Sequence, residues 1–407
     1  MRELPEGWKS LRLRDAGIWL SGGTPSTDEP RFWGGDIPWI SAASMKNFYV
    51  YDSDRRLTKS GSSAGTRIVG RGSVLFVVRG MSLKKEFRVG VTQRELAFGQ
   101  DCKAIIPRQD IDGTFLALAL KVRTGEILSM VDEAGHGTGR LPTDMVSRLE
   151  IGIPPLSEQR RITEILETLD SAIARSQSHA EKLNVTLTGL KRKLLADLTA
   201  EPGSSVIRYF DIKAGITLGP DRVPRNNGTP YLRVANVQRE RIDLEDIALL
   251  YASAAERLEL ALRTGDLLVV EGHANPDEIG RCARVPPEAS GTLYQNHLFR
   301  LRSEHTDPEF AEIWLNSESA RSYWRRMCAT SSGLYTINSK MLAALPFPAL
   351  HRDEQVRISK GPRDVQQQIT TERASLDKLR SIKQGLMEDL LTGRVQVSEA
   401  EAALENL

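Results

Sequence analysis

The sequence predicts an α+β protein built from a duplicated half, with two similar globular domains and two long helices. The first observation is a repeat, because Glu158-Gln159 returns as Glu354-Gln355, 196 residues later. The second is a set of short apolar runs bounded by Gly and Pro, which indicate strands outside the repeated segment. The third is the leucine spacing inside the repeated segment, which alternates between three and four residues as in a coiled-coil seam.

The repeat extends along a whole helical segment without a gap. Gly189-Leu190 returns as Gly385-Leu386, and Leu194-Leu195 returns as Leu390-Leu391, at the same separation of 196 residues. Solenoid repeats recur every 20 to 50 residues or so, which is far shorter. The pattern therefore indicates duplication of a half-protein.

Length and composition restrict the class of protein. A chain of 407 residues is long enough for two or more domains. Its net charge of +2 excludes a grossly basic histone-like protein but leaves room for a local nucleic-acid-binding patch. The 3 cysteines, which are widely spaced, predict neither a disulfide framework nor a zinc site. With no signal-like N-terminus and no apolar run of about 18 residues, we expect a soluble, cytoplasmic protein.

The first globular domain is predicted at residues 1–153. Apolar runs at residues 73–78 and 103–106 indicate strands, and residues 114–122 and 126–132 show helical patterns. Pro154-Pro155 closes this domain, and a long helix is predicted within residues 154–201. At ~1.5 Å per residue, a continuous helix over residues 158–200 would be roughly 60 Å long. Its expected seam comprises Ala180, Leu183, Leu187, Leu190 and Leu194.

The second domain, residues 202–348, echoes the first. Ile37-Pro38-Trp39 corresponds to Thr229-Pro230-Tyr231, and Gln100-Asp101 to Gln295-Asn296. A second long helix is predicted within residues 349–397, interrupted at Gly361-Pro362 because proline removes a helical hydrogen bond. Its expected seam comprises Ile369, Leu376, Leu379, Leu386 and Leu390. Residues 398–407 are expected to form a short, frayed acidic tail.

Motifs of the common nucleic-acid enzymes are not found. The chain has no GxxxxGK[ST] phosphate loop, and Asn275-Pro276-Asp277 lacks the second proline and the aromatic residue of an amino-methyltransferase motif. The glycine-rich residues 135–139 follow a predicted helix and are interpreted as a loop. We therefore predict no catalytic and no metal-binding residue. A self-contained methyltransferase or nuclease with an unrecognised site stays open as the alternative.

Two windows concentrate positive charge at comparable places in the two domains. Residues 79–94 contain five basic residues and one acid, Glu86, and residues 222–241 contain five arginines and one acid, Glu240. Such groups can neutralise phosphates or bind guanine, and nearby amides can read adenine. The alternative is a pair of ordinary solvated faces. The candidate DNA-binding residues are Lys46, Asn47, Arg79, Lys84, Lys85, Arg88, Arg225, Arg233, Asn236, Gln238, Arg239, His273, Asn275, Gln295 and Asn296.

We expect these candidates to fall into two groups, one that contacts phosphates and one that reads bases. Lys84, Lys85, Arg88 and Arg239 are expected to contact phosphates and set position. Arg233, Asn236, Gln238 and the Gln295-Asn296 pair are expected to contribute base readout.

The chain resembles the specificity subunit of type I restriction-modification systems over nearly its whole length. The most specific signal is the proline-leucine-serine-glutamate-glutamine entry to the first leucine-rich helix. The motifs that carry the resemblance are Leu4-Pro5-Glu6-Gly7-Trp8, Gly22-Gly23-Thr24-Pro25, Ile37-Pro38-Trp39-Ile40, Pro154-Pro155-Leu156-Ser157-Glu158-Gln159 and Leu390-Leu391-Thr392-Gly393-Arg394-Val395.

The resemblance implies two target-recognition domains, each reading one half of a split double-stranded DNA site. Two long antiparallel helices would form a coiled-coil spacer between them, giving an internal pseudo-twofold repeat. The family's subunit has no catalytic residues or cofactor. It docks two methyltransferase subunits, which bind S-adenosylmethionine, and two motor-nuclease subunits that use ATP and magnesium can join. No membrane partner is implied.

One feature of this chain bears on what the resemblance implies. The unlike sequences of residues 79–94 and 271–284 predict that the bipartite DNA site is asymmetric. A structural coiled-coil adaptor is the third possibility, but it would leave the two large domains without a purpose.

Overall fold

The computed structural model describes residues 4–134, 137–196, 198, 204–224, 228–331 and 334–405. It divides into two compact units. Unit 1 comprises Met1–Gln177 with Ala374–Leu407, and unit 2 comprises Ser178–Arg373. The two long helices each contribute residues to both units. Each unit therefore consists of one globular domain and the helix segments that pack on it.

Unit 1 contains three sheets beside a short strand pair. Their strand orders are β2-β11-β7-β9-β4, β5-β3-β10-β6 and β12-β13-β8, and β1 pairs with β14. The strands are β1 (Lys9–Arg12), β2 (Gly17–Ser21), β3 (Trp33–Ile40), β4 (Tyr49–Val50), β5 (Arg56–Leu57), β6 (Arg67–Val69), β7 (Val74–Val77), β8 (Arg79–Gly80), β9 (Val89–Thr92), β10 (Leu96–Phe98), β11 (Cys102–Pro107), β12 (Asp132–Ala134), β13 (Thr138–Arg140) and β14 (Glu150–Ile153). The helices of its globular domain are α1 (Lys59–Ser63), α2 (Gly113–Val122), α3 (Thr124–Ser129) and α4 (Thr143–Ser147), with the 3-10 turns η1 (Leu13–Asp15), η2 (Pro30–Phe32) and η3 (Met81–Lys84).

The core of unit 1 forms where the apolar runs predicted. All four residues of β7 are buried, and β11 covers the predicted strand at residues 103–106. The Asp112 carboxylate caps α2 by accepting hydrogen bonds from the backbone N–H groups of Thr114 and Phe115 at 2.9 and 3.0 Å. The helix predicted at residues 126–132 was wrong at its end, because Asp132 starts β12. That strand satisfies its backbone by pairing with β13.

Unit 2 repeats this topology with shorter strands. The orders β15-β24-β20-β22, β19-β16-β23 and β25-β26-β21 correspond to the three sheets of unit 1, and β17 pairs with β18. The strands are β15 (Asp211–Ala214), β16 (Thr229–Leu232), β17 (Val237–Gln238), β18 (Arg241–Ile242), β19 (Ala248–Leu250), β20 (Leu267–Val270), β21 (Gly272–His273), β22 (Cys282–Arg284), β23 (Leu293–Tyr294), β24 (Leu298–Arg302), β25 (Ala329–Ser331) and β26 (Leu334–Thr336). The helices of its globular domain are α6 (Ala254–Leu260), α7 (Pro308–Leu315), α8 (Glu318–Met327) and α9 (Ser339–Ala343), with the 3-10 turns η5 (Val206–Arg208), η6 (Pro220–Arg222), η7 (Val234–Asn236), η8 (Pro276–Glu278) and η9 (Pro287–Ala289). The shared strand order confirms the predicted duplication.

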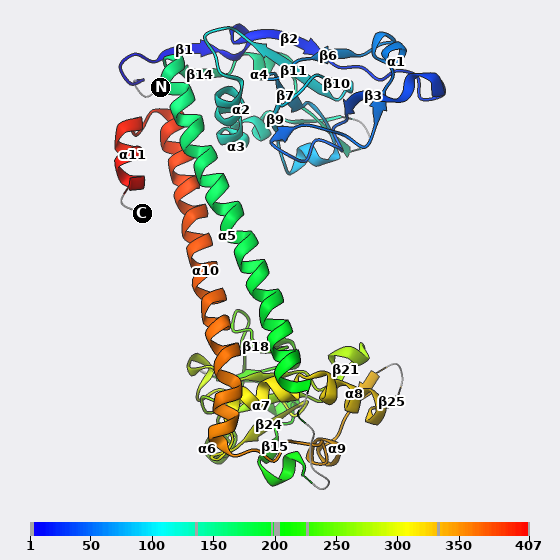
Figure 1. The fold of residues 1–407 in the computed structure, drawn as a ribbon, viewed down its shortest axis with the longest axis vertical. Helices are drawn as coiled ribbons and strands as arrows, with labels where there is room; N and C mark the ends of the chain where they lie inside the picture. Colours follow the sequence, from blue (N-terminus) through cyan, green and yellow to red (C-terminus); the bar gives the residue numbers. More distant parts are fainter. Residues whose placement is uncertain are drawn as a thin grey trace. The chain divides into compact units, whose positions relative to one another are not determined.

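The two long helices are α5 (Leu156–Ala196) and α10 (Arg352–Thr392), each of 41 residues. Within unit 1, Asp170 of α5 pairs with Lys383 of α10 at 2.5 Å. Within unit 2, His179 of α5 lies 3.3 Å from Glu372 of α10. Early residues of one helix therefore meet late residues of the other, so the helices are antiparallel (Figure 1). The predicted seam is confirmed, with Leu187 and Ile369 among its buried residues.

A buried glutamine docks each long helix to its globular domain. Gln159 in α5 accepts a hydrogen bond from the Asp112 N–H at 2.8 Å and donates to the Pro154 carbonyl at 2.8 Å. Gln355 in α10 likewise accepts from the Asp307 N–H at 2.8 Å and donates to the Leu350 carbonyl at 2.9 Å. The repeated Glu-Gln pair of the sequence thus marks the same joint twice.

The predicted interruption at Gly361-Pro362 was wrong, because α10 runs through Pro362 without a break. Pro362 is buried, and a Cβ on Gly361 would lie 3.4 Å from Leu190 in α5. The glycine lets α10 approach α5 closely, and this packing offsets the hydrogen bond that the proline removes.

The predicted frayed tail was also wrong, because residues 397–405 form the helix α11 (Val397–Glu405). Val397 and Ala400 are buried in the core of unit 1. Glu401 pairs with Arg161 of α5. Although the segment is acidic, its apolar residues recur at helical spacing, and their burial anchors α11 to unit 1. Among the described residues, no helix combines the length and apolar character that a membrane crossing requires.

Candidate nucleic-acid interface

In unit 1, two loops of the first domain meet beside the central sheet. The Arg88 guanidinium donates to the Ala42 carbonyl at 3.1 Å, and β4 pairs in parallel with β9. Lys46, Asn47 and Arg88 consequently line one hollow of about 90 Å³. Three predicted contact residues from two separate segments are thus brought together.

The positive groups of unit 1 differ in how strongly they are held. Lys84 pairs with Glu133 of β12, and Arg88 pairs with Glu86 at 2.9 Å. Arg79 and Lys85 are exposed. Lys85 and Arg79 are therefore the more available cations of the segment.

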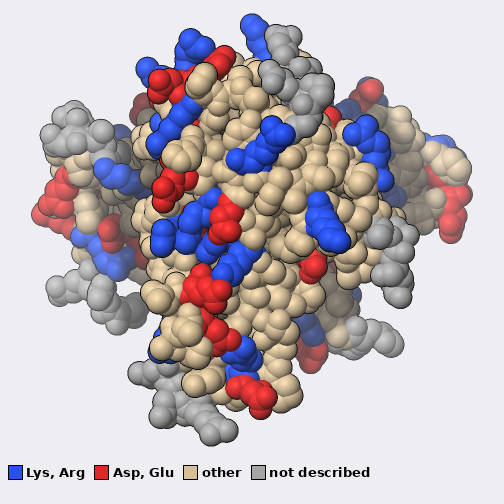
Figure 2. Space-filling view, turned by 90° about the horizontal axis from the view of Figure 1, so that it is seen from below, with Lys and Arg blue, Asp and Glu red and all other residues tan. Residues whose placement is uncertain are grey.

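The second basic window is not a bare positive patch, contrary to the prediction that its arginines face a single acid. Folding brings in acids from later segments, so that Arg222 binds Glu256 at 2.7 Å and Arg233 binds Asp246 at 2.7 Å. Hydrogen bonding to Arg222 holds the pKa of Glu256 at about 2. On the face shown in Figure 2, Lys and Arg side chains lie interspersed with Asp and Glu among other residues. The window is an ion-pair network with few unpaired cations.

Asn236 serves the fold and does not face solvent. Its side chain is 4% exposed. The amide oxygen accepts from the Arg233 N–H at 2.8 Å, and the amide nitrogen donates to the carbonyls of Asp243 and Asp246, each at 3.0 Å. With both ends of the amide occupied, this side chain is not available to bases.

The remaining candidates of unit 2 lie on turns of the domain. Gln238 is exposed and donates to the Ala235 carbonyl at 2.8 Å, while Asn275 is exposed beside the half-buried His273. Gln295 and Asn296 are half-buried between β23 and β24. Arg225 lies outside the described residues.

A cavity of about 470 Å³ in unit 2 has an acid and an imidazole at its wall. The His297 Nδ1 lies 2.6 Å from a Glu271 carboxylate oxygen. The backbone N–H of Glu271 donates to the His297 carbonyl, just as Val78 donates to Asp101 in unit 1. Equivalent positions thus carry Val78 and Asp101 in one domain but Glu271 and His297 in the other. The predicted correspondence of Gln100-Asp101 with Gln295-Asn296 was therefore wrong by one residue, since Asp101 matches His297.

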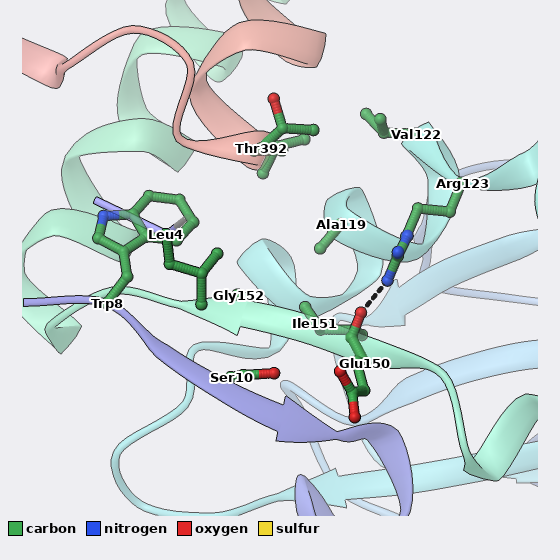
Figure 3. A pocket seen from close by; sticks show the side chains of 11 residues that line it. Leu4, Trp8, Ser10, Ala119, Val122, Arg123, Glu150, Ile151, Gly152 and Thr392 are labelled. Carbon is green, nitrogen blue, oxygen red and sulfur yellow. Dashed lines mark hydrogen bonds between the residues drawn. The ribbon is translucent and has the colours of Figure 1, made fainter. Parts of the chain in front are cut away.

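Unit 1 has a cavity of about 480 Å³ at a different place (Figure 3). Trp8, Gly152 and Thr392 line it, so it lies where the N-terminal segment, β14 and the end of α10 meet. At its edge the Arg123 guanidinium donates to the Glu150 carbonyl. The cavity therefore lies at the helix-docking joint, away from the loops that carry the candidates.

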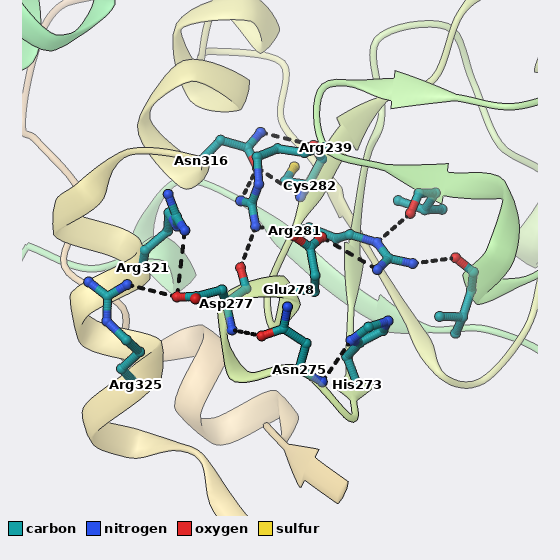
Figure 4. Close-up of polar contacts among 12 residues, drawn as sticks. Arg239, His273, Asn275, Asp277, Glu278, Arg281, Cys282, Asn316, Arg321 and Arg325 are labelled. Atoms are coloured by element: carbon teal, nitrogen blue, oxygen red, sulfur yellow. Dashed lines mark hydrogen bonds and ion pairs between the residues drawn. The ribbon is translucent and has the colours of Figure 1, made fainter. Parts of the chain in front are cut away.

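Sequence reasoning missed a polar cluster around Asp277 (Figure 4). The Asp277 carboxylate lies 3.1 Å from Arg325 and 3.6 Å from Arg321, both on α8. The Arg239 guanidinium donates to the Asp277 carbonyl at 2.7 Å and to the Asn316 amide oxygen at 3.1 Å. Burial lowers the pKa of Arg239. The spacing of Arg321 and Arg325, four residues apart behind a Ser317-Glu318 helix start, was the available signal.

No group of three or more His, Cys, Asp or Glu side chains suited to a metal ion occurs among the residues that the structure describes. The contacts above are instead those of a surface that positions amides, imidazoles and guanidinium groups. Such groups suit hydrogen bonding to phosphates and base edges.

Comparison with known proteins identifies a domain and several relatives. Residues 5–184 match the model of the type I restriction modification DNA specificity domain. The EcoR124I/EcoR124II specificity subunit of Escherichia coli is 30% identical over 40% of this chain and 41% of its own length. The EcoKI specificity subunit of Escherichia coli K12 is 28% identical over 60% of this chain and 57% of its own length. These alignments span about half of those relatives. The MjaVIII specificity subunit of Methanocaldococcus jannaschii is 22% identical over 97% of this chain and 94% of its own length.

Solved structures share the fold over nearly the whole chain. The HsdS subunit from Thermoanaerobacter tengcongensis has a TM-score of 0.56 and 17% identity, covering 97% of this chain and 99% of that one. The S subunit from M. genitalium has a TM-score of 0.52 and 14% identity, covering 96% and 98%. A chain from a structure of the type I R-M system has a TM-score of 0.62 and 16% identity, covering 97% and 100%. At these identities the likeness concerns the fold.

Proposed function

This chain belongs to the family of type I restriction-modification specificity subunits, and from that premise we propose that it reads an asymmetric bipartite DNA site. Each globular domain reads one half-site. The observation that carries the proposal is the pairing of one strand order with unlike residues at equivalent positions, as where Val78 and Asp101 correspond to Glu271 and His297. The two domains share one framework of strands but carry different loop residues, and this supports recognition of two different half-sites.

The contact residues divide into phosphate-binding and base-reading groups. In the first domain, the exposed Lys46, Arg79 and Lys85 contact phosphates, and Lys84 and Arg88 shape the loop that carries them. Asn47 contributes to base readout from the same hollow.

In the second domain, Gln238, His273 and Asn275 read bases, with the Gln295-Asn296 pair behind them. Arg233 and Arg239 stabilise the loops through their ion pairs and hydrogen bonds and reach phosphates only at their exposed edges. Asn236 is left out of the contact set because its amide is fully used in the fold.

The long helices act as a spacer and as a docking surface. Two methyltransferase subunits bind along α5 and α10 and supply S-adenosylmethionine, so this chain holds no cofactor and performs no catalysis. Motor-nuclease subunits that use ATP and magnesium join where the complex restricts DNA. The complex works in the cytoplasm, where the DNA is.

A salt titration of DNA binding tests the phosphate contacts. Replacing Lys84 and Lys85 together by Ala should weaken binding to all sequences and lower the slope of log affinity against log salt by about 1, because Lys85 is the one of the two that contacts a phosphate. Lys182→Ala, an exposed lysine on α5, is the control and should leave the slope unchanged. An unchanged slope in the double variant would contradict the assignment.

Turnover by the chain alone tests the absence of catalysis. Purified chain incubated with DNA, S-adenosylmethionine and magnesium should neither methylate nor cut. Methylation or cleavage would favour a self-contained enzyme instead.

A further inference from the structure

We propose that Asp277 is a positioning residue for a base-reading loop, residues 273–278, in which His273 and Asn275 both present hydrogen-bond donors to DNA. This rests on the proposed function and adds to it the chemistry that the second half-site must offer. Two donors side by side select a base edge with two acceptors. In the major groove that edge is the N7 and O6 pair of guanine.

Hydrogen bonds from backbone N–H groups of the loop determine which side-chain atoms of His273 and Asn275 can donate. The His273 Nδ1 accepts from the Asn275 N–H at 3.0 Å, which leaves its proton on Nε2. The Asn275 amide oxygen accepts from the Asp277 N–H at 3.0 Å, which leaves its NH₂ group available to donate. Both side chains thus have their acceptor atoms occupied and their donor atoms available.

Asp277 ties this loop to α8 and to the β17–β18 turn. Its carboxylate meets Arg325 and Arg321 of α8, and its carbonyl accepts from Arg239, next to the β17–β18 turn. Arg239 is in turn held by Asn316, which bonds both the N–H and the carbonyl of Cys282 in β22. Figure 4 shows Arg321, Arg325 and Arg239 gathered around Asp277.

The charges around Asp277 indicate that its ion pairs with Arg321 and Arg325 hold the loop in place. Arg321 and Arg325 also pair with Glu318, so each keeps one carboxylate partner when Asp277 is changed. The loop has no second carboxylate facing α8, since Glu278 points to Arg239 and Arg281 at 3.9 and 3.6 Å. Removing the Asp277 carboxylate therefore frees the loop more than it frees α8.

The matching segment of unit 1 is anchored differently. Between β8 and β9, η3 is held by Lys84, whose partner Glu133 lies on β12. The loop there supplies the cation, whereas in unit 2 the loop supplies the anion. The two segments consequently present different chemistry to the two half-sites.

The test selects bound sequences from a random duplex library, using the full chain assembled with methyltransferase subunits. Asp277→Asn should preserve one half-site and relax the other, with discrimination at the guanine position falling about tenfold. His273→Ala and Asn275→Ala should relax the same half-site. Glu318→Gln, which removes the other partner of the same arginines, is the matched control and should keep both half-sites intact.

The thermal unfolding temperature of each variant separates positioning from folding. An unchanged unfolding temperature with a relaxed second half-site supports the proposal. Both half-sites intact in Asp277→Asn, or both weakened together with a lower unfolding temperature, would overturn it, as would a second half-site without guanine. If the wild-type assembly selects no bipartite site at all, the proposed function itself fails.

Discussion

Asn236 and Asn275 carry the same amide, and the fold gives them opposite roles. Asn236 bridges three backbone groups inside the second domain, while Asn275 stands exposed on a turn. Buried polar groups must find partners, since a backbone group left unpaired costs about 1–3 kcal/mol. The residue type alone does not distinguish a buried amide that stabilises the fold from an exposed amide that is available to bind a partner.

Replacing Asn236 by Ala should therefore lower the free energy of unfolding by about 2–3 kcal/mol. Gln238→Ala, which removes one exposed amide, should change it by less than about 0.5 kcal/mol. Urea unfolding followed by circular dichroism measures both. Equal, small effects would contradict the structural role of Asn236.

Glu312 makes the stability of the second domain depend on pH. Burial raises the pKa of this carboxyl to about 7, against the lowering effect of Arg284. A carboxyl whose pKa is higher in the folded state binds its proton more tightly there. Its contribution is complete below about pH 4.5 and is lost as the pH rises to about 7.

We expect the free energy of unfolding to fall by up to about 3 kcal/mol across that range, and Glu312→Gln to remove most of the fall. Glu318→Gln, at an exposed position, should keep the wild-type profile. The free energy of unfolding, measured with urea at a series of pH values, tests this prediction. Parallel profiles for wild type and Glu312→Gln would disprove the assignment.

At the scale of elements, a buried glutamine helps to join each long helix to its domain. Gln159 is fully buried and serves three backbone groups, the Asp112 N–H and the carbonyls of Asp110 and Pro154. Gln159→Leu keeps the volume but leaves these groups unpaired, so we expect a loss of about 3 kcal/mol in unfolding free energy. Gln177→Leu, at an exposed position on α5, is the control. A loss no larger than in the control would show that the joint depends on apolar packing alone.

The continuous α10 makes a second prediction about elements. Alanine is better than proline inside a helix by about 3 kcal/mol, so Pro362→Ala should stabilise the protein, by less than that because Pro362 is buried. Helix content by circular dichroism should stay the same, since α10 already passes through this position. Gln367→Ala, on the exposed side of α10, should change stability by no more than about 0.5 kcal/mol. A clear gain in helix content for Pro362→Ala would mean that the helix is broken in the native protein.

Elements governed by periodicity were predictable from the sequence, and those governed by tertiary contacts were not. The leucine seam and the buried run of β7 follow from local patterns, so they were anticipated. The path of α10 through Pro362 depends on Leu190 of the facing helix, and α11 depends on burial of Val397. The pairing of Arg222 with Glu256 joins residues 34 positions apart, which a count of charges within a window cannot foresee.

At the scale of the whole molecule, we propose that duplication is what would let one chain read two sequences. The strand order is kept between the halves, while the residues on equivalent loops differ, as Lys84 and Asp277 do in their anchoring. A shared framework with independent loops lets each half-site change without disturbing the other. Exchanging residues of one reading loop should alter one half-site only.

The most direct test of the central claim is the set of DNA sites selected or methylated by a complex containing this chain. The proposal predicts two unlike half-sites separated by a fixed number of unread base pairs, with guanine in one of them. A single contiguous site, or a symmetric palindrome, would contradict the assignment of one half-site to each domain.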